Sequence, residues 1–208
     1  AICYAQGLAA NVDYMTASEA AAVTLTQLNN AFKDATGITH FEEFEYFIGI
    51  TNVGDANVNI AFRGCSNLKR INLPKTLTKL GGFTFAMVNL EELEIPAGCT
   101  VGGTSWFEGG IFRSGNCGRF IINEGVNLFM GSLETSPTYE WVLNGTHESY
   151  SVKDRCLYNL DYTTVYNVPK EKNLSEYFTE GLLSLEWLSC RLNNSEVITI
   201  PSSVTFIA

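Results

Sequence analysis

The chain has 208 residues, a net charge of −9 and a sequence pI near 4.7. Hydrophobic residues make up 46% and charged residues 17%, which is the composition of a globular protein that can bury a core. An acidic surface repels phosphate backbones and anionic headgroups, so we expect no nucleic-acid partner and no binding to a membrane surface. No apolar run approaches the roughly 18 residues of a membrane-spanning helix, so insertion into a membrane is not expected either.

The N-terminal segment carries helix signals. Thr16 and Glu19 have the spacing of a capping box, in which each side chain accepts a hydrogen bond from the other residue's backbone. The apolar residues that follow share one helical face, and Gly37 is placed to end the helix. A second box, from Thr39 to Glu42, predicts a short helix. The apolar residues are Leu25, Leu28 and Phe32 in the first helix, and Phe41, Phe44 and Phe47 in the second.

A short pattern recurs along the middle of the chain. Residues 68–74 read L-x-x-I-x-L-P, and residues 90–96 read L-x-x-L-x-I-P, 22 residues later and without a gap. An aromatic residue precedes each copy, Phe62 in one and Phe85 in the other. Weaker copies are Cys117-x-x-Phe120-x-Ile122-Asn123, followed by Val126, and a last segment with Ile198, Ile200, Pro201, Val204 and Ile207. A period near 22 residues is the signature of a solenoid.

Each unit is predicted to form one short strand with its apolar residues on the inner side. Ile71 and Leu73 would point inward from the strand, and Pro74 would end it because proline has no N–H for the ladder. Leu77 and Leu80 would then fold back over the same core. A single unit cannot bury these residues, whereas stacked units with parallel strands can. The alternative is an ordinary β-sandwich with chance similarity between the copies.

These units resemble a known family. The stretches AFRGCSNLKRINLPKTLTKLGG (61–82) and VITIPSSVTFIA (197–208) are similar to the BspA-like leucine-rich repeat family, whose units read aromatic, GC, x-x-L-x-x-I-x-I-P-x-x-V-x-x-I. The resemblance implies a secreted or surface protein of a host-associated bacterium that acts as an interaction scaffold and not as an enzyme. Residues 148–169 resemble a hairpin that such proteins insert between repeats, with NLDY (159–162) at its turn. Its two strands would carry Tyr150 and Val152, and Val165, Tyr166 and Val168.

The resemblance also implies an origin for the N-terminal loop. In related BspA-like sequences, a segment like EAAAV (19–23) follows an EF-hand or dockerin-type calcium loop. With Glu19 as the twelfth loop position, the first, third and fifth positions hold Leu8, Ala10 and Val12. Aliphatic side chains at these positions leave too few oxygen ligands for calcium. We therefore expect a degenerate loop that keeps its fold and binds no metal.

The six cysteines show neither metal-binding nor redox spacing. Their shortest separation is 18 residues, so the C-x-x-C pairs of zinc sites and thioredoxin-like motifs are absent. We expect free, buried thiols because cysteine is among the most buried residue types, although the even count also allows disulfides. The cysteines are Cys3, Cys65, Cys99, Cys117, Cys156 and Cys190.

Catalytic patterns are absent from the sequence. The two histidines, His40 in the second predicted helix and His147 in a turn, lie near no G-x-S-x-G elbow and no nucleophilic cysteine motif. The acidic runs at 42–45 and 91–94 could form carboxylate pairs for hydrolysis, but a solvated face explains them better. We expect no enzyme and no cofactor. A pocket that joined either histidine to a serine, a cysteine or a carboxylate would revive the enzyme hypothesis.

Outward-facing residues of stacked strands should form columns. One column would hold Arg70, Glu92 and Arg119, and the next would hold Asn72, Glu94 and Ile121. Alternating charge favours cross-strand pairing, at about 0.2–1 kcal/mol per pair, so a purely structural charge ladder is one interpretation. The other is a binding face, completed by aromatic residues of a glycine-rich insertion. Its candidate residues are Arg70, Asn72, Glu92, Glu94, Trp106, Phe107, Arg119 and Ile121, with Phe112 on the same insertion.

Both ends of the sequence add an expectation. The chain starts at Ala1 without Met or a charged segment, as expected of a mature or trimmed chain. Its last residues, IPSSVTFIA (200–208), stop half a unit after the proline without a polar cap. We expect either further repeats beyond this point or self-association through the open C-terminal repeat.

We therefore predict an α+β repeat protein: a leucine-rich-repeat solenoid with short parallel strands, an N-terminal helical cap and an inserted β-hairpin. Residues 1–50 would form the cap and residues 51–208 the solenoid, with insertions at about 102–116 and 129–180. The predicted function rests largely on the resemblance. It is adhesion or another non-enzymatic interaction, in a secreted or cell-surface setting, with a host or bacterial surface protein or glycan. The alternative is a structural or assembly scaffold without a ligand of its own.

Overall fold

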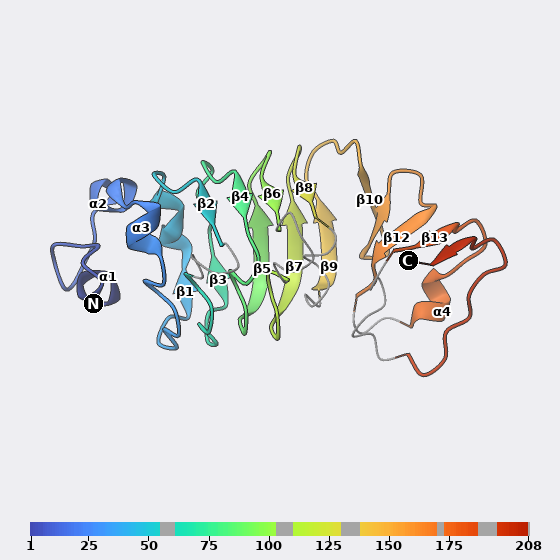
Figure 1. Cartoon of the computed structure of the whole chain (residues 1–208), viewed down its shortest axis with the longest axis horizontal. Helices are drawn as coiled ribbons and strands as arrows, with labels where there is room; N and C mark the ends of the chain where they lie inside the picture. Colours follow the sequence, from blue (N-terminus) through green and yellow to red (C-terminus); the bar gives the residue numbers. More distant parts are fainter. Residues whose placement is uncertain (55–60, 103–109, 130–137, 170–172, 187–194, 208) are drawn as a thin grey trace.

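The computed structural model of the chain describes residues 1–54, 61–102, 110–129, 138–169, 173–186 and 195–207. The molecule is elongated, with short helices at the N-terminal end, a stack of strands in the middle and a second group of strands at the C-terminal end (Figure 1). The helices are α1 (Ile2–Ala5), α2 (Ala17–Ala22), α3 (Leu25–Leu28), the 3₁₀ helix η1 (Glu42–Tyr46) and α4 (Leu174–Tyr177). None of the helices in these ranges combines the length and the apolar character that a bilayer span requires.

The stack is built from coils that add strands to two rows. Its strands are β1 (His40–Phe41), β2 (Asn52–Val53), β3 (Arg70–Ile71), β4 (Lys79–Leu80), β5 (Asn89–Ile95), β6 (Thr100–Val101), β7 (Asn116–Ile122), β8 (Asn127–Leu128) and β9 (Thr138–Leu143). In one row, β2, β4, β6 and β8 form a parallel sheet of two-residue strands. In the other row, β1 pairs with β3, and β5, β7 and β9 form a parallel sheet. The predicted repeat fold with short parallel strands is confirmed.

The register between strands confirms how the sequence copies align. Leu90 lies opposite Cys117 and Leu93 opposite Phe120, so the third copy has the predicted alignment although Asn123 replaces the proline. The backbone N–H of Glu91 donates to the carbonyl oxygen of Lys69 at 2.9 Å and joins β5 to the preceding strand. The β1–β3 pair and the sheet of β5, β7 and β9 therefore continue one another along the stack.

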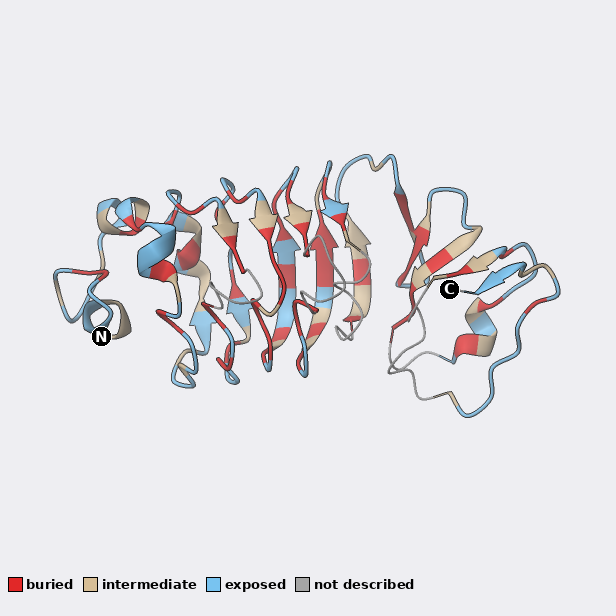
Figure 2. Ribbon diagram, in the orientation of Figure 1, coloured by how far each residue is buried: buried red, intermediate tan, exposed pale blue. Residues whose placement is uncertain are grey.

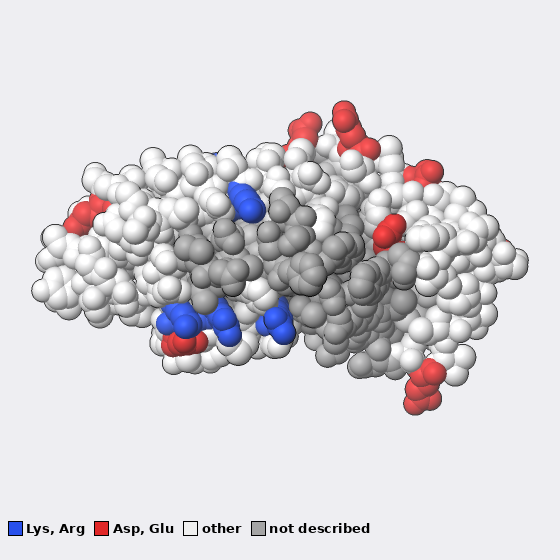
Figure 3. Space-filling view, in the orientation of Figure 1, with Lys and Arg blue, Asp and Glu red and all other residues white. Residues whose placement is uncertain are grey.

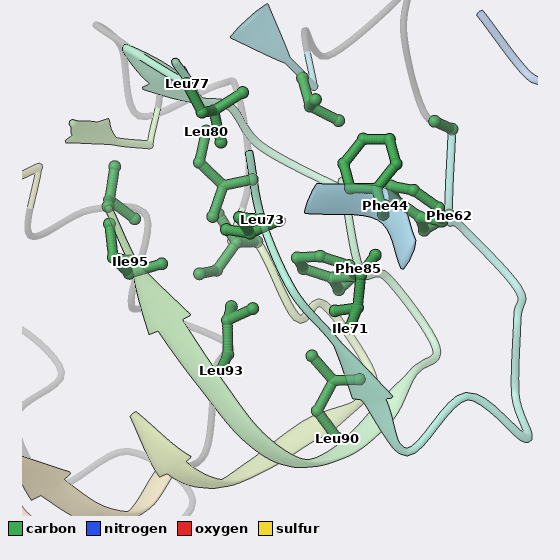
Figure 4. Packing of buried hydrophobic residues seen from close by; sticks show 14 of the residues in the cluster. Phe44, Phe62, Ile71, Leu73, Leu77, Leu80, Phe85, Leu90, Leu93 and Ile95 are labelled. Carbon is green, nitrogen blue, oxygen red and sulfur yellow. The ribbon is translucent and has the colours of Figure 1, made fainter. Parts of the chain in front are cut away.

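The hydrophobic core fills the space between the two rows. Ile71, Leu73, Leu77 and Leu80 are all buried, as predicted, and Figure 4 shows them gathered with the equivalent leucines and isoleucine of the next copy. Burial follows the inner side of each coil, while the turns at both edges are exposed (Figure 2). A fully buried side chain of this size contributes about 1.5–3 kcal/mol relative to an exposed one. Repetition of these residues from coil to coil is what makes the stack stable.

Four phenylalanines form a continuous ladder inside the stack. The rings of Phe32, Phe62, Phe85 and Phe112 follow one another at centroid distances of 5.6, 5.6 and 5.7 Å, with interplanar angles of 1°, 17° and 21°. All four side chains are buried. The prediction that Phe112 lies on an exposed insertion is therefore wrong, because its coil continues the ladder that Phe62 and Phe85 begin.

The first predicted helix is divided in two. The capping box of Thr16 and Glu19 is present and starts α2, as predicted. The helix then ends at Val23, and a second capping box of Thr24 and Gln27 starts α3. Thr24 has the extended backbone of an N-cap residue, which no continuous helix could accommodate. Leu25 is consequently 40% exposed, and the helical segment is over at Leu28, well before Gly37.

The second predicted helix starts later than expected and is a 3₁₀ helix without the predicted capping box. His40 belongs to β1, where it pairs with Arg70, and not to a helical turn. The helix that follows is the 3₁₀ helix η1, which has no side-chain cap, so the predicted box from Thr39 to Glu42 does not form. Pairing with β3 holds the backbone of the segment extended up to Phe41. Phe44 and Phe47 are nevertheless buried, as their apolar spacing suggests, and the Phe44 ring lies against Phe62 of the ladder.

The C-terminal part contains three strands in the region of the predicted two-stranded hairpin and two further strands beyond it. Its strands are β10 (Tyr150–Lys153), β11 (Cys156–Asn159), β12 (Thr164–Asn167), β13 (Ser184–Leu185) and β14 (Phe206–Ile207). Strands β10, β11 and β12 form an antiparallel meander, and β13 and β14 add to it in parallel. The NLDY turn lies between the second and third of these strands, while Asp154 and Arg155 form the first turn with positive φ. The extra turn arises because the chain already reverses at Asp154 and Arg155, so β11 forms between the two strands that the sequence predicted.

Only the end of the last sequence copy forms a strand of the fold. Ile207 pairs with Leu185 in β13, a strand that the sequence pattern missed. Ile198 and Ile200 lie outside any strand, and each is 42% exposed, so the expectation that they point into a core is wrong. Without a strand to fix alternation, nothing turns these two side chains inward.

The described cysteines carry free thiols. Cys65, Cys99, Cys117 and Cys156 are buried and Cys3 is half-buried, while Cys190 lies outside the described residues. Burial raises the pKa of the Cys65 thiol to about 11 and that of Cys99 to about 12. Thiols with raised pKa values carry little thiolate at neutral pH and are poor nucleophiles. These cysteines therefore serve as small core residues.

Candidate binding face

The outer face of the strand row that contains β5 and β7 carries the predicted charged column. Glu92 lies opposite Arg119, as predicted, and Arg119 lies opposite Glu140 on the next strand. At the other end, Arg70 lies opposite His40. The column therefore extends one strand further in each direction than the sequence pattern indicated.

The charges of this face pair with one another. Arg70 Nε lies 3.1 Å from Glu91 Oε2, so its partner is Glu91 and not the Glu92 of the predicted column. Arg119 bridges two strands, with Nη1 at 3.1 Å from Glu92 Oε2 and Nε at 3.5 Å from Glu140 Oε2. All of these side chains are about half exposed, so each pair contributes at most about 1 kcal/mol and is screened by salt.

The second predicted column has exposed polar side chains at one end and a buried side chain at the other. Asn72 and Glu94 are exposed, but Ile121, which lies opposite Glu94, is buried. Asn123 donates through Nδ2 to Glu94 Oε1 and to the backbone oxygen of Ile95, both at 2.9 Å. The asparagine that replaces the expected proline thus orients the Glu94 carboxylate. Ile121 offers no exposed surface to a partner.

Two shallow pockets adjoin on this face and share Asn72 and Glu94. The first has a volume of about 380 Å³ and is lined by Glu42, Arg70, Ile71, Asn72, Glu91, Glu92, Glu94 and Arg119. The second has a volume of about 450 Å³ and is lined by Glu45, Asn72, Leu73, Lys75, Glu94, Pro96, Ala97 and Asn123. Sequence reasoning missed Glu42 and Glu45, which η1 brings to the pocket walls. Their acidic run was visible in the sequence, but only the fold places it beside the sheet.

The predicted aromatic anchors cannot be added to this face. Trp106 and Phe107 lie outside the described residues. Phe112, the third aromatic residue of the predicted insertion, is buried in the phenylalanine ladder. The described face is therefore polar and charged, with apolar lining only from Ile71, Leu73, Pro96 and Ala97.

The histidines and acids form no catalytic set in the described part of the chain. His40 Nδ1 lies 3.2 Å from Thr39 Oγ1, and His147 Nε2 lies 3.1 Å from the backbone oxygen of Asn144. Within the same ranges, no group of three histidine, cysteine or acidic side chains is placed to hold a metal ion. At the N-terminal loop, the Glu19 carboxylate accepts hydrogen bonds from the N–H groups of Ala10 and Thr16. A carboxylate used in this way caps a helix, and an EF-hand or dockerin origin of the loop finds no support.

The geometry defines a class of protein. Coils of about 21 to 30 residues, each with a short inner-facing strand of leucine or isoleucine, make this a leucine-rich repeat fold. Comparison with protein families points to a particular type of repeat. Residues 28–129 match the family described as "BspA type Leucine rich repeat region (6 copies)". No curated protein sequence matches the chain.

Three solved structures of bacterial proteins match the chain, and the first of them shares its fold. A leucine-rich repeat protein from Eubacterium ventriosum matches with a TM-score of 0.62 and 19% identity over 85% of this chain. The pneumococcal vaccine antigen PcpA matches with a TM-score of 0.42 and 18% identity over 75% of the chain. A leucine rich cell surface protein from Faecalibacterium prausnitzii matches with a TM-score of 0.41 and 20% identity over 86% of it. This chain corresponds to 45%, 50% and 46% of those three chains, respectively, and so spans half of their length or less.

Proposed function

We propose that this chain is a non-enzymatic interaction module that binds a protein or glycan outside the cell. The observation that carries the proposal is the pair of adjoining pockets on the outer face of the strand row. The strands that bear them are held in register by the stacked core, so the lining side chains form a preorganised surface. The match of residues 28–129 to a BspA-type leucine-rich repeat family supports a secreted or cell-surface setting, which that resemblance implies. The division into a cap (1–50) and repeats (51–208) is part of the proposal.

Charge and shape support one part of the proposed face as its centre. Asn72 and Glu94 line both pockets, and Lys75 lines one of them. All three side chains are exposed, and none belongs to an ion pair of the described face. Arg70 and Arg119, in contrast, are already paired with glutamates, so a partner would have to break those pairs. We therefore place the contact centre at Asn72, Lys75 and Glu94, with Arg70, Glu92 and Arg119 at its border.

A binding screen tests the proposal. The purified chain is presented to immobilised extracellular-matrix proteins and to an array of glycans, beside a face variant with Asn72→Ala, Lys75→Ala and Glu94→Ala. A matched control carries Asn144→Ala, Glu148→Ala and Lys153→Ala, which remove the same types of exposed side chain from another part of the chain. We expect at least a tenfold loss of affinity in the face variant and none in the control. Equal losses in both variants, or no ligand for the wild type, would contradict the proposed face.

The second candidate function is a scaffold without a ligand. It is favoured by the Arg119 pairs to Glu92 and Glu140, which connect three strands and form a charge ladder of structural use. On this hypothesis the chain would bind nothing in the screen and would instead self-associate. Sedimentation of the wild type over a range of protein concentrations distinguishes the two functions.

A further inference from the structure

A second charged surface lies along the turns that precede strands of the repeats. Lys33, Arg63 and Arg113 each directly follow a ring of the phenylalanine ladder, and all three are exposed. Figure 3 shows lysine and arginine side chains gathered along one lower edge of the repeats. We call Lys33, Arg63 and Arg113 the cation row. The protein as a whole has a net charge of −9, so a local excess of positive charge is not a general property of its surface.

The coils place the members of the cation row at equivalent positions. The residue after each member, or after Ala86 in the intervening coil, has a left-handed backbone: φ is 58° at Asp34, 79° at Gly64, 62° at Met87 and 61° at Ser114. These turns are joined from coil to coil by hydrogen bonds, from Asp34 N to Arg63 O at 2.8 Å, from Gly64 N to Ala86 O at 2.9 Å and from Met87 N to Arg113 O at 2.9 Å. The order along the edge is therefore lysine, arginine, alanine, arginine.

This order sets the spacing of the charges. Adjacent backbones in such a ladder lie ~4.8 Å apart, so Lys33 and Arg63 are neighbours and Arg113 follows after a gap of about 10 Å. Ala86 at the gap is buried and adds no charge. The row is straight, because it follows the ladder, and it is on the order of 15 Å long. Such a row fits one extended chain with widely spaced negative charges.

The cations of the row are free to bind. Among the described residues, Lys33, Arg63 and Arg113 form no ion pair, whereas Arg70 and Arg119 on the other face are paired. Arg113 lies over the ring of Phe83 at 5.3 Å from its centroid, which orients the guanidinium without neutralising it. Among the described residues, Asp34 is the acidic residue that directly adjoins a member of the row in the sequence, so these turns carry three positive charges and one negative charge. A net positive edge remains.

We propose that the cation row binds a sparsely sulfated polysaccharide. Guanidinium groups contact the oxygens of sulfate or carboxylate in pairs, and two of the three members of the row are arginines. The half-exposed ring of Phe83 beside Arg113 offers an apolar face against which a sugar ring can pack. Nucleic acid is disfavoured, because three contacts cannot hold a backbone with a charge every few ångströms against the acidic remainder of the protein.

Chondroitin sulfate is the probe for this proposal. The wild type is compared with a row variant, Lys33→Gln, Arg63→Gln and Arg113→Gln, and with a control, Lys79→Gln, Lys153→Gln and Arg155→Gln, that loses the same charge outside both proposed faces. Circular dichroism and urea unfolding verify that the variants are folded. We expect the row variant to bind at least tenfold more weakly and the control to stay within twofold of the wild type. The affinity of the wild type should fall with salt at a logarithmic slope of about −2, for three contacts at ~0.7 each.

Three results would overturn the proposal. The wild type could show no affinity for chondroitin sulfate, or the control could lose as much affinity as the row variant. The third result concerns the class of partner. The wild type could bind poly-dT or polyglutamate as tightly as chondroitin sulfate, with the same loss of affinity in the row variant. The row would then bind anions in general and not a polysaccharide. The proposal is independent of the pocketed face, because the variant with Asn72→Ala, Lys75→Ala and Glu94→Ala should keep its affinity for chondroitin sulfate.

Discussion

The indole N–H of Trp141 donates a hydrogen bond to Oδ1 of Asn167 at 3.0 Å, and both side chains are buried. Trp141 lies on β9, the last strand of the stacked row, and Asn167 ends the meander strand β12. The backbone N–H of Leu128 makes a second connection between the two parts by donating to the Tyr150 hydroxyl at 3.0 Å. These two hydrogen bonds hold the C-terminal strands against the repeats.

The Trp141 bond predicts a clear energetic coupling. Asn167→Leu leaves the indole N–H buried without a partner, and we expect a loss of about 1–3 kcal/mol in the free energy of unfolding. In a Trp141→Phe background there is no indole N–H. Asn167→Leu then leaves no buried donor without a partner, so it should lower the free energy of unfolding distinctly less. Urea unfolding of the wild type, both single variants and the double variant measures the coupling. Strictly additive losses would show that the bond contributes nothing.

The phenylalanine ladder predicts a large effect at one position. Phe85 stacks between Phe62 and Phe112, so Phe85→Ala opens a cavity with rings on both sides. We expect a loss of about 3–5 kcal/mol in unfolding free energy. Met87→Ala, an exposed change in the same coil, is the control and should lie within about 0.5 kcal/mol of the wild type. A Phe85→Ala variant as stable as this control would contradict a continuous ladder.

The capping box at α2 predicts a smaller effect. Thr16 Oγ1 accepts from Glu19 N at 3.2 Å, while Glu19 Oε2 accepts from Thr16 N at 2.7 Å. Thr16→Ala removes the first bond and should cost about 1 kcal/mol in unfolding free energy. Ser18→Ala, inside the same helix, is the matched control and should have little effect. If the two variants lose the same stability, the box does not stabilise the N-terminal helix.

The bridging arginine predicts a dependence on salt. Because Arg119 and its two glutamates are about half exposed, Arg119→Met should cost less than about 1 kcal/mol at low salt. In 1 M NaCl the difference from the wild type should shrink further, since the Debye length is then about 3 Å. Arg63→Met, which breaks no ion pair, is the control and should show no such salt dependence. A difference that persists in high salt would point to packing by the Arg119 stem.

The buried thiols predict a loss of stability at alkaline pH. Burial raises the pKa of Cys99 from 9.0 to about 12 in the folded protein. Above pH 9 the unfolded chain releases this proton while the folded chain keeps it, so the unfolded state gains stability as pH rises from about 9 toward 12. Cys99→Ala should remove this part of the decline. Unfolding free energies at pH 7, 9 and 10 measure it, and parallel curves for both proteins would contradict the prediction.

The repeat itself could be predicted because its signal is local. The spacing of Leu68, Ile71, Leu73 and Pro74 specifies a short strand with an inner face, and it recurs in order along the chain. Backbone register then follows from burial, since a shift of one residue would turn every apolar side chain outward. This is why the copy at Cys117 aligns as predicted even without its proline.

The remaining features depend on tertiary contacts that the spacing does not reveal. Phe32 and Phe112 join the ladder from coils whose lengths differ, so no fixed period connects them to Phe62. Arg70 could reach either of two neighbouring glutamates, and the side-chain conformation selects Glu91. The cation row escaped notice for the same reason, because its members lie 30 and 50 positions apart in the sequence.

The paired strands of the stack have one more consequence, which concerns how such a chain changes over evolutionary time. Asn52 pairs with Lys79, Lys79 with Thr100 and Thr100 with Asn127, so successive coils differ in length although their strands remain in register. Residues gained or lost between strands change mainly the free-energy cost of loop closure. This cost grows only by about 0.6 kcal/mol for each doubling of loop length. Selection can therefore remodel the connecting segments of one coil at a time while the neighbouring coils keep their structure.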